Sequence, residues 1–121
     1  LLGITILTSW TRESFANDLL INQSIDQRVK HLAEIALNSG LGGCVCSPRE
    51  VRFLREIYPE SFDLITPGIR SIGSDNNDQS RVSDASEALK MGASKLVIGR
   101  AITQSNDPAY VFKSFCDKVV S

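Results

Sequence analysis

Two arginines stand where they could bind a phosphate group. Arg70 ends the segment "TPGIR" (66–70), and Arg100 directly follows Gly99. A guanidinium presents a planar set of N–H donors that matches phosphate oxygens, and glycine lets backbone N–H groups approach an anion. Both segments come directly after short apolar stretches of the chain. They therefore indicate an anion site, provided that the fold brings them together. The alternative is that both are surface arginines paired with acids.

Apolar and helical segments alternate along the chain. The expected strands are 1–7, 43–46, 62–66 and 95–98, and the expected helices are 24–40, 47–59, 83–92 and 107–119. The strands are apolar throughout, which is typical of parallel strands buried on both faces. Helix starts are marked by Ser24 with Gln27, and by Ser47 with Pro48 and Glu50, which we expect to form capping boxes.

The length of the repeat predicts the fold class. Each strand and its helix take roughly 30 residues, the size of one unit in an eight-unit barrel of about 250 residues. The 121 residues (1–121) are expected to form a single domain with four such units. The sequence therefore predicts an α/β fold, half of a (β/α)8 TIM barrel with four parallel βα units. The alternative is an open parallel sheet that lacks a strand or two.

Polar residues gather after the expected strands. Parallel α/β folds keep their functional residues at the carboxyl ends of the strands, and in barrels the loops after the last two strands frequently bind phosphate. Thr8 follows the first strand here, Arg70 the third, and Gly99 with Arg100 the fourth. By spacing alone, Thr8 is more simply a strand end, and Trp10 is favoured as a cover for the core over a surface for base stacking.

Four motifs in this order resemble the C-terminal half of orotidine 5′-monophosphate decarboxylase of the bacterial type. They are "GITILTS", "TPGIR", "DQSR" and "LVIGRAITQSNDP", and the resemblance runs from Leu1 almost to Ser121. It implies strands five to eight of a barrel that converts orotidylate to UMP in de novo pyrimidine synthesis. The family needs no cofactor and no metal, so we expect neither here, and it is usually a homodimer.

The resemblance also assigns roles to individual residues. Thr8 matches the residue that contacts the pyrimidine. Arg70 and Gln79 match the pair that holds the phosphate. The polar segment 71–81, which begins directly after Arg70 and contains Gln79, matches the loop that closes over the phosphate. Gly99 and Arg100 match the donors that complete the phosphate site.

The catalytic motif of the family is missing from this chain. That motif is Asp-x-Lys-x-x-Asp on an earlier strand, and no Asp-x-Lys occurs here. Four of the lysines fall on expected helices, and Lys95 opens a strand at the end away from the site. We therefore expect no catalytic residue in this chain and no activity of the chain alone.

Composition bounds the remaining possibilities. The net charge is −1, from 13 basic and 14 acidic residues, which gives no electrostatic case for nucleic acid or an anionic membrane. Three cysteines argue against a disulfide framework and for a cytoplasmic protein. Cys44 and Cys46 are expected on opposite faces of a strand, as buried structural thiols rather than metal ligands. Leu1 opens in mid-strand without a methionine, which predicts a processed start or a piece of a longer protein.

A half-barrel leaves two strand edges and an apolar inner face uncovered. We therefore expect a homo-oligomer or a separate N-terminal half as partner, with a phosphate-bearing nucleotide, orotidylate or UMP, as ligand. Three hypotheses stay open. The chain is part of an orotidylate decarboxylase, or a non-catalytic remnant that self-associates and retains phosphate or nucleotide binding, or another phosphate-binding barrel such as a sugar-phosphate lyase or epimerase. "TPGIR" followed by "DQSR" argues against the third.

Overall fold

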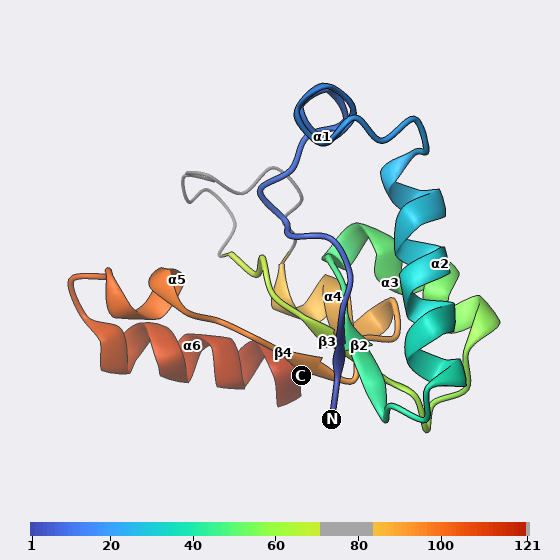
Figure 1. Ribbon diagram of the computed structural model, residues 1–121. Coiled ribbons are helices and arrows are strands. Elements are labelled where there is room, and N and C mark those ends of the chain that lie inside the picture. The colour runs from blue at the N-terminus through green and yellow to red at the C-terminus, as the bar shows by residue number, and fades with distance from the viewer. Residues whose placement is uncertain (71–83, 121) are drawn as a thin grey trace.

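The structure, a computed structural model, describes residues 1–70 and 84–120 (Figure 1). In these residues the strands β1 (Gly3–Ile4), β2 (Gly43–Val45), β3 (Asp63–Thr66) and β4 (Lys95–Leu96) form one sheet. The helices are α1 (Arg12–Leu19), α2 (Ile25–Asn38), α3 (Pro48–Ile57), α4 (Ala85–Lys90), α5 (Arg100–Thr103) and α6 (Pro108–Val120). All strand pairs are parallel, and helices lie between consecutive strands along the chain, so the four predicted βα units are confirmed.

The strand order distinguishes a barrel segment from an open doubly wound sheet. The order is β1-β2-β3-β4, so each strand lies beside its predecessor in the chain. A doubly wound sheet reverses its order at a switch point, and the described residues show no reversal. The sheet therefore curves in one sense around an axis, as the wall of a (β/α)8 barrel does.

One face of the sheet is buried under helices. Cys44 pairs in register with Leu64, and both side chains are fully buried. Val29 of α2 and Val51 and Leu54 of α3 are fully buried in the same cluster. Burying apolar area contributes roughly 25 cal/mol per Å², so this layer supplies the main stabilising term of the described fold.

The expectation that Cys44 and Cys46 lie on opposite faces is wrong. Side chains two residues apart on a strand point to the same face, and both thiols are buried in the one cluster under the helices. The expectation that they are buried is confirmed.

The other face of the sheet, called the open face below, carries the apolar side chains Ile4, Val45, Ile65 and Val97 and, at its amino end, the charged side chains Asp63 and Lys95. Ile4 pairs in register with Val45, and Val45 with Ile65. Ile65 is buried at the centre, whereas Ile4, on the outer strand β1, is 62% exposed and Val97, directly after the outer strand β4, is 50% exposed. The prediction that the first strand is buried on both faces is therefore wrong for this chain, because no described element covers its open side.

Two helices were not predicted from the sequence. Residues of α1 lie in the polar connection between the first expected strand and the first expected helix, where Thr11 accepts a hydrogen bond from the Ser14 N–H at 3.1 Å. The apolar content of α1 is low and only Phe15 is buried, so it lacks the apolar period that marks a helix in sequence. The other, α5, has only four residues and is too short to show a period.

The predicted helix starts are confirmed for α2 and in part for α3. Ser24 and Gln27 exchange hydrogen bonds, since the Gln27 N–H donates to Ser24 Oγ at 3.2 Å and the Ser24 N–H to Gln27 Oε1 at 3.1 Å. At α3, the Ser47 N–H donates to Glu50 Oε2 at 2.7 Å. The side chains thus satisfy backbone donors that have no partner inside the helix.

The amino ends of β3 and β4 are joined by Arg55 of α3. Its guanidinium donates to the carbonyls of Phe62 and Gly92 at 3.1 and 3.0 Å, and to Ser94 Oγ at 3.0 Å. Gly92 has a φ of +107°, and a Cβ there would lie 2.7 Å from Arg55 Cγ. Residue 92 must therefore adopt a positive φ and must leave no side chain against Arg55, and glycine satisfies both conditions.

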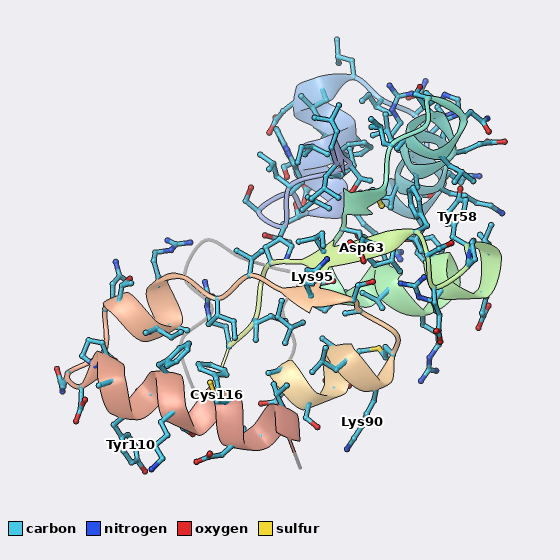
Figure 2. All side chains as sticks on the ribbon, turned by 90° about the horizontal axis from the view of Figure 1, so that it is seen from below. Tyr58, Asp63, Lys90, Lys95, Tyr110 and Cys116 are labelled. Atoms are coloured by element: carbon cyan, nitrogen blue, oxygen red, sulfur yellow. The ribbon has the colours of Figure 1, made fainter. Side chains whose placement is uncertain are left out.

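An ion pair lies near the same ends of these strands. Lys95 Nζ lies 2.7 Å from Asp63 Oδ2, and Figure 2 shows the two side chains side by side. The hydrogen bond from Lys95 holds the pKa of Asp63 below its ordinary value of 3.8. Beside it, a Cβ on Gly43 would lie 2.7 Å from Asp63 Cβ, so β2 and β3 pair closely here only because residue 43 is glycine.

We predict that Leu20→Gly raises the melting temperature. Leu20 ends α1 with φ of 55° and ψ of 36°, and its side chain is 84% exposed. A left-handed conformation costs a non-glycine residue about 1–2 kcal/mol, and little packing is lost with an exposed side chain. Glycine also increases the conformational entropy of the unfolded chain, which offsets part of this effect. The net increase in the free energy of unfolding should be about 0.5–1 kcal/mol. The matched control, Leu19→Gly inside the helix, should lower stability instead. A lower melting temperature for Leu20→Gly would contradict this account.

We predict that Asp63→Asn destabilises the chain at pH 7 and has a smaller effect in acid. Because the folded-state pKa of Asp63 lies below its ordinary value, the ion pair adds stability above pH 3.8 and loses it as the pH falls through the lowered pKa. Urea unfolding at pH 7 and near pH 3 measures the difference. Combining Asp63→Asn with Lys95→Gln should add little to either change alone, and a pH-independent effect would exclude the ion pair as its cause.

Candidate functional site

The carboxyl ends of the parallel strands all lie at the same end of the sheet, so the predicted site residues that follow the strands also lie at that end. Arg70 follows β3 and Gly99 follows β4, its neighbour, while Thr8 follows β1 at the other side of the sheet. Neighbouring strands lie about 4.8 Å apart, so three spacings, roughly 14 Å, separate the β1 and β4 ends along the sheet. Anion donors thus gather at one side and a hydroxyl lies at the other.

Arg70 is held at the end of β3 by a tight turn. Gly68 has a φ of +79°, a conformation that favours glycine, and it follows Pro67. The Arg70 side chain is 7% exposed, and its Nη1 donates to the carbonyl of Ile69 at 2.9 Å. A guanidinium has five N–H donors, and a buried cation is costly unless it meets an anion. The burial of Arg70 therefore fits a group that receives a negatively charged ligand.

Gly99 and Arg100 lie where β4 passes into α5. Both are exposed, and Gly99 precedes the first residue of the helix. The Gly99 carbonyl accepts from the Ile102 N–H at 2.8 Å, which fixes the turn. Nothing lies within 4 Å of the position of a Cβ on Gly99. The space above this glycine is thus open to a ligand.

At the other side of the site, Thr8 is buried in the turn after β1, with 7% of its surface exposed. Trp10 packs against the core cluster, as favoured from the sequence, and also lines a cavity of about 340 Å³. This cavity lies where α2 and α3 begin, and its other lining residues are Thr11, Arg12, Ile25, Asp26, Arg49 and Glu50.

Glu50 is a residue whose position the sequence did not reveal. A capping glutamate usually faces solvent, but the Glu50 side chain is fully buried beside the Cys44 and Cys46 thiols. The hydrogen bond to Cys44, burial and the Glu50 carboxylate all raise the pKa of Cys46, so this thiol stays neutral. Ser47 Oγ is also buried and has no hydrogen bond to the described residues. The start of α3 therefore buries two polar side chains, those of Ser47 and Glu50.

Other predicted features lie away from this site or outside the described residues. Gln79 falls in 71–83, outside the described residues. Lys30, Lys90, Lys113 and Lys118 lie on helices and Lys95 at the start of β4, as predicted from the sequence. In the residues that the structure describes, no group of three or more His, Cys, Asp or Glu side chains could hold a metal ion. Nor does any described helix have the length and apolar character needed to cross a membrane.

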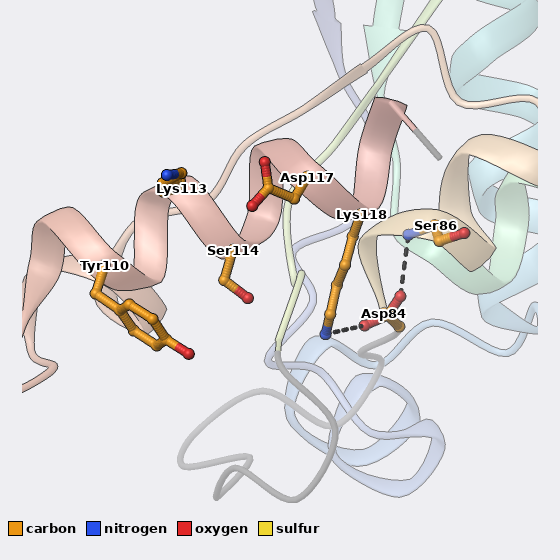
Figure 3. Close-up of a pocket in the computed structure, with 7 residues that line it drawn as sticks. All are labelled: Asp84, Ser86, Tyr110, Lys113, Ser114, Asp117 and Lys118. Carbon is orange, nitrogen blue, oxygen red and sulfur yellow. Dashed lines mark hydrogen bonds and ion pairs between the residues drawn. The ribbon is translucent and has the colours of Figure 1, made fainter.

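A larger cavity of about 670 Å³ lies between α4 and α6 and contains none of the predicted site residues (Figure 3). Lys118 Nζ lies 3.6 Å from Asp84 Oδ2 there, and Asp84 Oδ1 accepts from the Ser86 N–H at 3.0 Å. The lining is completed by Tyr110, Lys113, Ser114 and Asp117. Its acids and lysines balance in charge, and its helices lie on the outer side of the sheet.

Comparison with known proteins gives relatives along nearly the whole chain. Orotidine 5′-phosphate decarboxylases of Prochlorococcus marinus are 88% identical over 119 residues (strain NATL1A) and 55% identical over 116 residues (strain MIT 9211). These matches cover 98% and 96% of this chain but 49% and 48% of the relatives. The chain therefore spans about half the length of the curated relatives it matches.

Solved structures agree with this extent. The crystal structure of orotidine 5′-phosphate decarboxylase from Lactobacillus acidophilus matches 100% of the chain and 49% of its own, with a TM-score of 0.81 and 30% identity. The enzyme from Pyrococcus horikoshii, at 22% identity and a TM-score of 0.61, supports the fold alone. The prediction of half a (β/α)8 barrel is thereby confirmed.

The family comparison covers residues 1–115, which match the model described as orotidine 5′-phosphate decarboxylase / HUMPS family. Together with the strand order and the half-length alignments, this shows that the chain belongs to the orotidine 5′-phosphate decarboxylase / HUMPS family, of which it represents half a barrel.

Proposed function

We propose that this chain supplies the phosphate-binding half of an orotidylate decarboxylase, which converts orotidylate to UMP in pyrimidine synthesis. The observation that carries the proposal is the adjacency of the Arg70 and Gly99–Arg100 turns at the ends of β3 and β4, with Thr8 across the sheet. A nucleotide monophosphate carries an anionic phosphate at one end and a polar ring at the other. These ends correspond to the two arginines and to Thr8 on opposite sides of the proposed site. The names of the relatives support the same substrate.

In the proposed site each residue has a distinct task. The buried Arg70 guanidinium and the exposed Arg100 guanidinium donate to the phosphate, Gly99 leaves room for it, and Gln79 completes the set. Thr8 donates to or accepts from the pyrimidine ring. Binding energy from a remote phosphate can be used to stabilise the transition state at the ring, so this half would lower the barrier without touching the reacting carbon.

The proposed chemistry needs a proton donor that this chain lacks. The carbanion left by loss of carbon dioxide must be protonated, and a proton donor has to lie within hydrogen-bond reach. Every lysine lies on a helix or at the amino end of β4. We therefore infer that the chain is inactive by itself and acts in the cytoplasm together with the first half of the barrel. The non-catalytic remnant that only binds the nucleotide is the second candidate, favoured by the same absence.

Activity assays separate these two candidates. The chain alone should show no decarboxylation of orotidylate, followed by its loss of absorbance. Adding the separately purified first half of the strain NATL1A relative should restore turnover, with a kcat of order 1 s⁻¹ for a working enzyme. Turnover by the chain alone would overturn the inference of inactivity. Nucleotide binding without turnover in the mixture would favour the remnant.

We predict that Arg100→Ala weakens binding of UMP but not of uridine. A hydrogen bond to a charged group contributes about 1.5–3 kcal/mol, so the Kd for UMP should rise roughly 10- to 100-fold. Calorimetry on the chain with and without the first half measures this. Arg100 is exposed, so the fold should be unaffected, and Arg52→Ala, an exposed arginine on α3, is the matched control. An equal loss for uridine, or no loss for UMP, would remove Arg100 from the phosphate site.

A further inference from the structure

The sheet has two unpaired edges in the described residues, because β1 and β4 are its outer strands. The open-face side chain of Ile4, on β1, is 62% exposed, and that of Val97, directly after β4, is 50% exposed. Each partner buries roughly 800 Å² in a stable interface, and an open sheet face with two unpaired edges offers apolar surface for such an interface.

The two edges are complementary to each other. Beside β4, an apolar groove of about 370 Å³ lies between the strand and α6, with Leu96, Phe112 and Val119 in its lining. Phe112 and Val119 are 58% and 45% exposed. Beside β1, Leu1 is 98% exposed.

Leu1 lies on the side of β1 that faces the helices. A Cβ on Gly3 would lie 2.8 Å from Ala36 Cβ of α2, and Leu1 is two residues before Gly3. An apolar side chain at one edge thus lies in the same layer as an apolar groove at the other edge. Within one chain the two cannot meet, because β2 and β3 separate the edges.

We propose that the isolated 121-residue chain forms a twofold dimer in which two copies close one eight-stranded barrel. A twofold axis along the barrel places β1 of each copy parallel to β4 of the other, so both edges are paired and the ring is complete. Eight parallel strands form a barrel whose interior side chains just fill. The open faces then cover each other, and a net charge of −1 per chain opposes association only weakly. This inference does not rest on the proposed activity.

Sedimentation equilibrium of the purified chain at about 1–100 μM tests the dimer. The expected mass is twice 13.2 kDa. Ile4→Glu places a charge on the open face and should shift the mass to that of one chain. Ile57→Glu is the matched control, since Ile57 is 46% exposed on α3, away from both edges, and it should stay dimeric. Far-UV circular dichroism confirms that the variants are folded.

A second variant keeps the test decisive if Ile4→Glu fails to fold. Val97→Lys, on the β4 edge, should also give the single-chain mass. A single-chain mass for the unaltered protein, a mass above two copies, or a dimer insensitive to both single substitutions would overturn the proposal.

Discussion

The close pairing of β2 with β3 is the contact on which the described structure depends. It sets Cys44 beside Leu64 in a fully buried row, and α2 and α3 pack on that row from one side only. The pairing is possible because Gly43 leaves room for Asp63. Once the helices occupy one face, the other face of every strand must turn toward a common interior. Ile4 and Val97 are exposed because no described element covers this face beside the two outer strands.

The contacts that stabilise the sheet and the residues of the proposed binding site lie at opposite ends of the strands. At the amino ends, Arg55 joins the loop before β3 and the loop before β4 by hydrogen bonds, and Lys95 pairs with Asp63, so that end is fixed by direct contacts within the chain. The carboxyl ends carry a buried arginine, an open glycine and a fully buried glutamate. Parallel strands bring these residues to one edge although they are far apart in sequence. Changes at that edge can therefore alter binding without removing the contacts that hold the sheet.

A half-barrel divides a site between two parts. In the proposed enzyme, this half would grip the phosphate and the other half would protonate the ring carbon. Such a division would account for a chain that carries the proposed phosphate-binding residues at the carboxyl ends of its strands, while all its lysines lie on helices or at the amino end of β4. The self-paired barrel inferred here covers the same apolar face without supplying that proton donor. The proposed association therefore does not depend on the proposed catalytic role.

The sequence by itself determined the alternation of strands and helices, the starts of α2 and α3, and the placing of Arg70, Gly99 and Arg100 after the third and fourth strands. These follow from local periodicity, capping residues and chain order. It did not reveal α1, whose residues have no apolar period. The expectation that Cys44 and Cys46 lie on opposite faces was wrong, because residues two apart on a strand share a face. Only the tertiary structure decided that Glu50 and Arg70 are buried and that Ile4 and Val97 are exposed, because burial depends on which distant segments cover a side chain.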